Sequence, residues 1–188
     1  MPEDLDQLLM DLFVESLHNG PGDIRDHLNA LALLAASCEH ITEFGTSVGI
    51  STSALMLARP KRLTTYDTVR SPRVDRLESV ARQTGIEFSF RQQSTRQLGE
   101  LEPTDLLFID TLHVQAQLTA ELFWAPQVRR YIVMHDTVTF GIYPEHPASD
   151  SGRGLLFALL PFLKENKSQW RLAAHYQHNN GLTVLERI

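Results

Sequence analysis

The sequence has one cysteine, Cys38, among its 188 residues, so a disulfide within the chain is excluded. It also lacks a long apolar run, because the longest one, residues 31–38, is far too short to cross a bilayer. The first residues, MPEDLDQ, are acidic and lack the basic start of a signal peptide. We therefore expect a cytoplasmic protein with no membrane partner, in which Cys38 is a small core residue.

Basic clusters are scarce as well. Seventeen Lys and Arg residues stand against 23 Asp and Glu, and no basic run exceeds short pairs such as Arg129-Arg130. Proteins that bind nucleic-acid backbones usually carry a basic patch, so we expect no nucleic-acid partner. The hydrophobic content of 43% and the charged content of 21% are those of an ordinary globular domain.

Apolar periodicity predicts two leading helices and then strands that alternate with helices from His40 onward. The predicted helices cover residues 3–18, 23–36, 51–59, 71–84, 113–128 and 153–165. The predicted strands cover residues 40–44, 62–67, 86–90, 105–110, 131–136, 170–176 and 182–188. This order predicts an α/β fold with a Rossmann-like, mostly parallel sheet of about seven strands and helices on both faces.

The ends of the chain depart from simple alternation. Asn179-Asn180-Gly181 predicts a C-terminal antiparallel hairpin, and we expect strand 170–176 to run parallel to its neighbours. Residues 1–188 are predicted to form a single domain, with residues 1–38 as a helical cap on a core of residues 39–188. The cap is either a lid or a dimer surface, so a homodimer stays open.

A glycine-containing loop, Glu43 to Thr52, joins the first core strand to its helix. In open α/β sheets, ligands bind at the carboxyl ends of the strands, so this loop should face a ligand. A dinucleotide fingerprint would need glycines at positions 47 and 50, which hold Ser47 and Ile50. NAD and FAD are therefore disfavoured, and the phosphate-binding Gly-Lys-Ser/Thr pattern is missing too.

The loop resembles motif I of class I S-adenosylmethionine (SAM)-dependent methyltransferases, E-x-G-x-x-x-G-x-S. The resemblance implies that Glu43 suits the cationic end of SAM and that backbone amides from Gly45 to Gly49 suit its carboxylate. The alternative is a tight strand-to-helix turn without a ligand. The candidate cofactor residues in this loop are Glu43, Gly45, Thr46, Ser47, Gly49 and Ser51.

Two later strand ends add candidates for the same cofactor. Asp67 ends the second strand, where an acid can accept hydrogen bonds from both ribose hydroxyls, and Thr68 follows it. After the third strand, similar methyltransferases often carry an acid near the adenine amine. This chain has Gln93 and Ser94 there, and the glutamine carbonyl can still accept from that amine.

The stretch FIDTLHVQAQLTAELFWAPQVRRYIVMHDT resembles a family of bacterial O-methyltransferases related to cephalosporin- and sugar-modifying enzymes. In metal-dependent members of this kind, acids at the ends of strands four and five hold Mg²⁺. Here Asp110, His135 and Asp136 occupy those ends, and the imidazole also suits a transition metal such as Mn²⁺. The alternative is that Asp110 and Asp136 cap strands and bind the cofactor amine.

His113 follows Asp110 by three residues and can act as a base at neutral pH. The alternative is a helix cap or a packing contact with the cofactor. Three regions are expected to line the acceptor pocket: the Asn179-Asn180-Gly181 turn, the leading helices, and the loop over residues 140–151 with Tyr143, Glu145, His146 and Asp150. Asn180 is expected to serve turn formation alone.

These features predict a SAM-dependent methyltransferase that methylates an oxygen of a small hydroxylated acceptor, a sugar or a secondary metabolite, with metal assistance left open. Two alternatives remain: a SAM-binding module without activity, and a nucleotide-dependent oxidoreductase on the same fold.

Overall fold

We describe a computed structural model that covers residues 5–19, 22–146 and 152–188. The chain divides into two compact units, residues 1–94 and 95–188. In the described part of the chain, no helix combines the length and the apolarity that crossing a bilayer requires.

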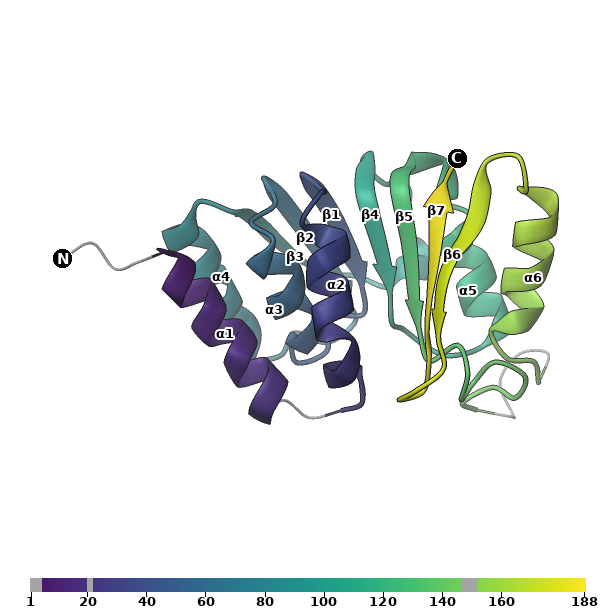
Figure 1. The fold of residues 1–188 in the computed structure, drawn as a ribbon, viewed down its shortest axis with the longest axis horizontal. Helices are drawn as coiled ribbons and strands as arrows, with labels where there is room; N and C mark the ends of the chain where they lie inside the picture. Colours follow the sequence, from purple (N-terminus) through teal and green to yellow (C-terminus); the bar gives the residue numbers. More distant parts are fainter. Residues whose placement is uncertain (1–4, 20–21, 147–151) are drawn as a thin grey trace. The chain divides into compact units, whose positions relative to one another are not determined.

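The first unit holds four α-helices and three parallel strands (Figure 1). The helices are α1 (Leu5–Asn19), α2 (Leu28–Ala35), α3 (Ile50–Leu57) and α4 (Arg73–Thr84), and a 3₁₀ turn (Ile24–His27) precedes α2. The strands are β1 (His40–Phe44), β2 (Arg62–Asp67) and β3 (Glu87–Gln92), in the order β3-β2-β1.

The helices of this unit end and pack as their sequences dictate. Val74, Leu77, Val80 and Ala81 form the buried stripe of α4, as their spacing predicts. Gly85 ends the helix in the left-handed conformation. The second leading helix differs from the prediction: Asp23 makes no side-chain cap, and the segment begins with a 3₁₀ turn because its first residues form the tighter hydrogen bonds.

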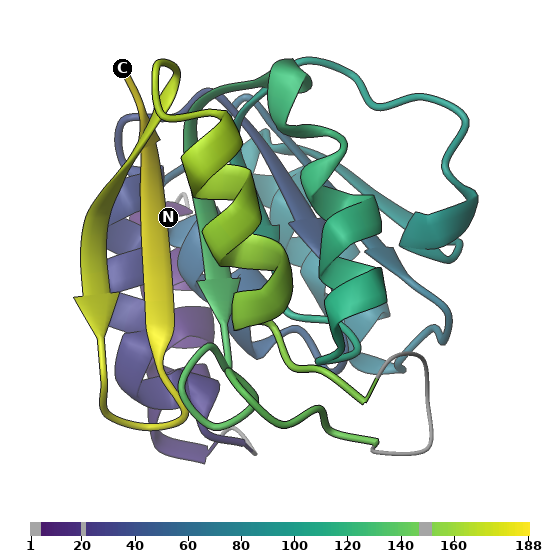
Figure 2. The ribbon, with the colours of Figure 1, turned by 90° about the vertical axis from the view of Figure 1, so that its right-hand side faces the viewer.

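The second unit holds two α-helices and four strands. The helices are α5 (Gln115–Leu122) and α6 (Leu156–Glu165), with 3₁₀ turns at Thr95–Gln97 and Ala125–Gln127. The strands are β4 (Thr104–Ile109), β5 (Val128–His135), β6 (Trp170–Tyr176) and β7 (Leu182–Arg187). Figure 2 shows α5 and α6 side by side over one face of these strands.

Strand pairing in this unit is mixed, in the order β4-β5-β7-β6. Strands β4 and β5 are parallel, whereas β7 is antiparallel to both β5 and β6. The expectation that strand 170–176 pairs in parallel with its neighbours is therefore wrong, although β6 runs in the same direction as β5 and the turn that follows it lies beside the end of β5. The tight turn at residues 179–181 folds β7 back onto β6 and inserts it next to β5, so the described part of the chain pairs β6 with β7 alone.

The predicted fold class is confirmed: seven strands, mostly parallel, end in an antiparallel hairpin and are accompanied by helices. One helix boundary was predicted too far along the chain. The helix expected over residues 113–128 covers Gln115–Leu122, and Pro126 lies in the separate 3₁₀ turn that follows, since proline lacks the N–H that would continue an α-helix.

Candidate functional site

The glycine loop of the first unit turns sharply between β1 and α3. Gly45 and Gly49 adopt positive φ angles of 92° and 73°. Residues other than glycine rarely adopt such angles, because their Cβ atom clashes with the backbone. The Gly45 N–H donates to the Tyr66 carbonyl at 2.9 Å, and the Gly49 N–H donates to the Thr46 carbonyl at 2.7 Å. The loop is thus fixed on β2 at one end and closed on itself at the other.

Glu43 is fully buried and its carboxylate faces α3. The Ser51 hydroxyl donates to one carboxylate oxygen and the Thr52 hydroxyl to the other, both at 2.6 Å. These bonds connect the C-terminal end of strand β1 to the first turn of helix α3. Contact between Glu43 and the cationic end of SAM stays a prediction, as does a direct contact of Ser51.

Asp67 joins the end of β2 to the glycine loop. One carboxylate oxygen accepts the Ser47 N–H at 2.7 Å, and the other accepts the Val69 N–H at 3.1 Å. The Gln93 N–H donates to the Asp67 carbonyl at 2.8 Å. The structure therefore brings three predicted cofactor residues, Ser47, Asp67 and Gln93, to one edge of the parallel strands.

Thr68 and Ser94 complete this edge in different ways. Thr68 is exposed, and its carbonyl accepts a hydrogen bond from the Gln92 side chain at 3.3 Å. Ser94 is half-buried and immediately follows Gln93. The buried Thr46 hydroxyl donates to the Tyr66 carbonyl at 3.3 Å, so Thr46 attaches the glycine loop to strand β2.

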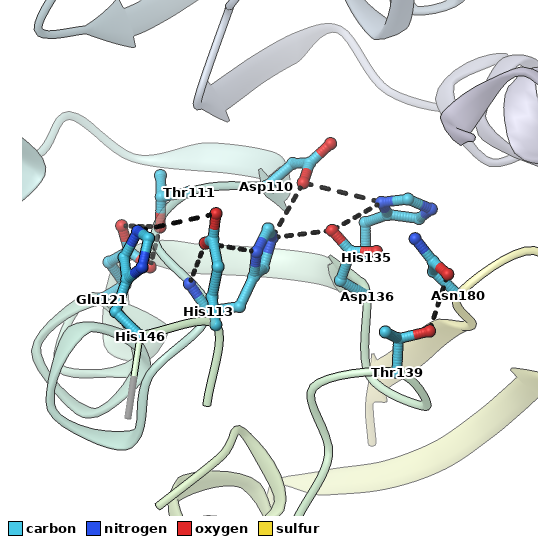
Figure 3. Close-up of polar contacts among 10 residues, drawn as sticks. Asp110, Thr111, His113, Glu121, His135, Asp136, Thr139, His146 and Asn180 are labelled. Atoms are coloured by element: carbon cyan, nitrogen blue, oxygen red, sulfur yellow. Dashed lines mark hydrogen bonds and ion pairs between the residues drawn. The ribbon is translucent and has the colours of Figure 1, made fainter. Parts of the chain in front are cut away.

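In the second unit, two acids and two histidines from the ends of β4 and β5 and the start of the α5 segment meet in one cluster (Figure 3). His113 Nε2 lies 2.8 Å from an Asp136 oxygen and 3.3 Å from an Asp110 oxygen. His135 Nδ1 lies 3.4 Å from Asp136 and 3.6 Å from Asp110. At these lengths the His135 contacts are weaker than the short His113–Asp136 pair.

The cluster stabilises charge on all four groups. Burial alone would lower the pKa of His113, but contacts with Asp110 and Asp136 outweigh it and raise that pKa to about 10. The pKa of His135 rises to about 10 by the same balance. Burial alone would raise the pKa of both acids, but the two histidines hold these pKa values below their usual range.

Asp136 has two features that single it out. Its φ of 61° lies in the left-handed region, which non-glycine residues enter at an energetic cost and often at functional sites. Its Oδ1 is buried and accepts no hydrogen bond from the residues that the structure describes. A buried carboxylate oxygen with spare acceptor capacity suits a cation or a donor group from a ligand.

The residues present fit a divalent metal. One ligand atom from each of Asp110, His113 and Asp136 lies within 4.8 Å of the others. Two carboxylates and an imidazole form a donor set suited to Mn²⁺ and related ions, and carboxylates alone suit Mg²⁺. His113, predicted as a base, therefore lies in this set, and the predicted ligand His135 contacts both of its acids through Nδ1, at 3.4 and 3.6 Å.

Glu145 was predicted as part of the acceptor loop but not as a contact of His113, and Glu121 was not predicted at all. Glu145, 32 residues from His113, accepts from His113 Nδ1 at 3.0 Å. Buried Glu121 accepts hydrogen bonds from Thr95, Thr111 and Gln117 at 2.7–2.8 Å, and burial raises its pKa to about 7. The i,i+4 spacing of Gln117 and Glu121 was the one local signal, and nothing local marks Glu145.

The expected acceptor loop is described in part, since residues 147–151, including Asp150, lie outside the described residues. Asn180 meets this loop from the β6–β7 turn. Its side-chain oxygen accepts from the Thr139 hydroxyl at 2.6 Å, and its carbonyl accepts from the Val138 N–H at 2.8 Å. Asn180 thus fixes the loop after β5 in addition to forming the turn.

Solved structures supply the comparison. An O-methyltransferase from Streptomyces achromogenes, TomG, involved in tomaymycin synthesis and solved with SAM, matches with a TM-score of 0.64 at 20% identity, over 98% of this chain and 90% of that one. An O-methyltransferase from Bacillus cereus solved with S-adenosylhomocysteine (SAH) matches with a TM-score of 0.62 at 18% identity, over 98% and 90%.

The fold extends to enzymes with another acceptor atom. The N-methyltransferase NodS from Bradyrhizobium japonicum, solved with SAH, matches with a TM-score of 0.59 at 16% identity, over 96% of this chain and 97% of that one. No protein-family model and no curated protein matches the chain. The chain therefore has the fold of class I SAM-dependent methyltransferases.

Proposed function

We propose that this protein is a SAM-dependent methyltransferase that methylates a hydroxyl oxygen of a small molecule, a sugar or a secondary metabolite. The observation that carries the proposal is the glycine loop after β1, whose Ser47 amide is bonded to the carboxylate at the end of β2. Solved structures of the same fold that hold SAM or SAH support the cofactor.

In the proposed cofactor site, Asp67 receives the two ribose hydroxyls. Its carboxylate is already oriented by the Ser47 and Val69 amides, and each oxygen has further acceptor capacity. The left-handed glycines let the loop backbone approach the methionine part of the ligand closely. The two bonds from α3 orient the Glu43 carboxylate, and each of its oxygens also keeps acceptor capacity for the proposed contact with the cationic end of SAM.

The remaining cofactor assignments follow the strand ends. Gln93 is proposed to accept from the adenine amine, with Thr68 and Ser94 beside it, and Asp110 to accept from the methionine amine. Methyl transfer is an in-line displacement at a carbon that the sulfonium already activates, so alignment of donor and acceptor is the main requirement. A covalent protein nucleophile is not needed.

The acid–histidine cluster of the second unit is the proposed acceptor site. Asp110, His135 and Asp136 would hold a divalent cation, which would lower the pKa of a bound hydroxyl and fix its position. His113 Nε2 is the proposed contact to the acceptor oxygen. As a base, His113 would take the hydroxyl proton at Nε2 while its Nδ1 proton stays hydrogen-bonded to Glu145.

The test is isothermal titration with SAM and SAH, with and without Mg²⁺ and Mn²⁺. Micromolar SAM binding that Asp67→Asn and Gly45→Val weaken would support the proposal, provided that Asp11→Asn, at an exposed position of α1, leaves it unchanged. Absence of SAM and SAH binding in every condition would refute it. Tight binding without methyl transfer to any hydroxylated acceptor would favour a binding module, and NADH binding would favour an oxidoreductase.

A further inference from the structure

The segment after β5 returns to His113 and restrains its ring from several directions. The Phe140 ring stacks on the His113 ring with centroids 4.9 Å apart and planes inclined by 6°. The Glu145 N–H donates to the His113 carbonyl at 3.2 Å. One Glu145 carboxylate oxygen then accepts from His113 Nδ1 at 3.0 Å and lies 3.4 Å from the His113 backbone N–H.

These contacts determine which ring nitrogen faces the acid pair. A carboxylate can only accept from an imidazole nitrogen that carries a proton, because ionised Glu145 has no donor. Nδ1 is thereby committed to Glu145, and Nε2 faces Asp110 and Asp136 (Figure 3). The Phe140 stack fixes the ring plane at the same time.

We infer that Glu145 is a positioning residue that holds His113 with Nε2 directed at the acceptor oxygen. The inference rests on the proposed methyl transfer. Histidines that act in catalysis or in metal sites are commonly oriented by a carboxylate on the second nitrogen. Glu145 is the acid that fills this place here, and its side chain is 36% exposed against 15% for His113, so it shields the ring from one side.

The placement has a consequence for specificity. Glu145 belongs to the loop after β5 that is expected to line the acceptor pocket, and Phe140 begins the same segment. The segment that selects the acceptor therefore also orients the residue that contacts the acceptor oxygen. A loop that merely closed over the site would not need a carboxylate aimed at a ring nitrogen.

The first test reads the ring itself and needs no acceptor. Protein labelled with ¹⁵N-histidine is compared as wild type, Glu145→Gln, Glu145→Asp and Glu100→Gln, with His113→Gln to assign the His113 signals. Glu100 is an exposed acid outside the cluster. We expect the His113 Nδ1 signal to move in Glu145→Gln, to return toward wild type in Glu145→Asp, and to stay in place in Glu100→Gln. An unchanged Nδ1 signal in folded Glu145→Gln would overturn the inference.

The second test measures methyl transfer from labelled SAM to catechol, a small acceptor with two adjacent hydroxyls. We expect Glu145→Gln to lower kcat by about 10- to 100-fold, with KM and the SAM dissociation constant unchanged, and Glu145→Asp to recover part of kcat. A higher KM with wild-type kcat would mean that Glu145 only anchors the loop, and would overturn the inference.

The two proposals fail in different ways. If the wild type binds no SAM, the proposed function fails, and an unchanged or shifted Nδ1 signal still decides whether Glu145 orients His113. If SAM binds but catechol is not methylated, the ¹⁵N comparison alone decides, by the same criteria.

Discussion

Gly49 is a position where the structure predicts a large loss of stability from one added methyl group. Its φ of 73° is left-handed, and a Cβ at this position would lie 2.6 Å from Leu77 Cδ1 on α4. Left-handed backbone costs a non-glycine residue about 1–2 kcal/mol. Crowding a packed contact adds about 1–3 kcal/mol. Gly49→Ala should therefore lower the free energy of unfolding by about 2–5 kcal/mol.

Gly85 provides the matched control for this prediction. Its φ of 76° is nearly the same, but a Cβ there would meet no atom within 4 Å. Gly85→Ala should therefore cost the backbone part alone, about 1–2 kcal/mol. Urea unfolding of both variants, followed by circular dichroism, isolates the Leu77 contact as their difference. If Gly49→Ala is no less stable than Gly85→Ala, the reasoning from the Leu77 contact is wrong.

A double variant sharpens the comparison. Leu77 is fully buried, so Leu77→Ala alone should cost about 2–5 kcal/mol through the cavity that it leaves. That cavity would accept the extra methyl group of Gly49→Ala. The double variant should therefore be more stable than the sum of the two single losses predicts, and strict additivity would contradict the proposed contact.

Three further predictions follow from the described contacts. Asp67→Asn should weaken SAM binding by about 10-fold or more, because a bond to a charged acceptor is lost; unchanged affinity by titration calorimetry would contradict its role. Burial raises the pKa of Glu121 to about 7, so the wild type should lose about 3 kcal/mol of unfolding free energy as the pH rises from 4.5 to 7. Glu121→Gln should flatten this pH dependence. An equally steep profile in urea unfolding of the variant would refute the prediction. In metal-free protein, the raised pKa of His113 stabilises the fold fully below pH 6.5 and loses that effect as pH rises through about 10. Asp136→Asn should lower the pKa of His113, which NMR titration of the ring measures. An unchanged pKa in the variant would contradict the prediction.

Much of the fold could be predicted because its signals are local. The strands over residues 40–44, 62–67 and 170–176 match β1, β2 and β6 in both bounds, since each is a short apolar or β-branched segment between turn residues. The pairing of β6 could not be read in this way. Strand direction relative to a neighbour depends on which strand inserts between which, and this is set by contacts far apart in sequence.

The candidate sites divide along the same line. Residues at strand ends, such as Asp67, Asp110 and Asp136, were predictable because the carboxyl ends of parallel strands meet at one edge. The contact that orients His113 was not predictable, since Glu145 reaches His113 across 32 residues and carries no motif. The sequence also does not reveal that both oxygens of Glu43 turn toward the hydroxyls of α3.

Backbone strain provides a signal independent of any motif. Five non-glycine residues in the described chain have positive φ, and three have ordinary local causes. Arg59 follows the C-terminal end of α3, and Asn179 and Asn180 form the β6–β7 turn, places where left-handed residues are common. The remaining two are Ser47 and Asp136.

Ser47 is the second residue of the turn that the Gly49 N–H closes on the Thr46 carbonyl, and Asp136 directly follows β5, so each follows a strand at a candidate site. Such strain costs about 1–3 kcal/mol and persists where surrounding contacts enforce it. For Ser47, the enforcing contact is the Asp67 carboxylate on its N–H. For Asp136, it is the Phe140 N–H on its carbonyl, at 3.0 Å, together with the His113 ion pair. Both units thus hold one residue away from its preferred backbone where the candidate ligand groups converge, which argues that these loops are shaped for binding rather than for connection alone.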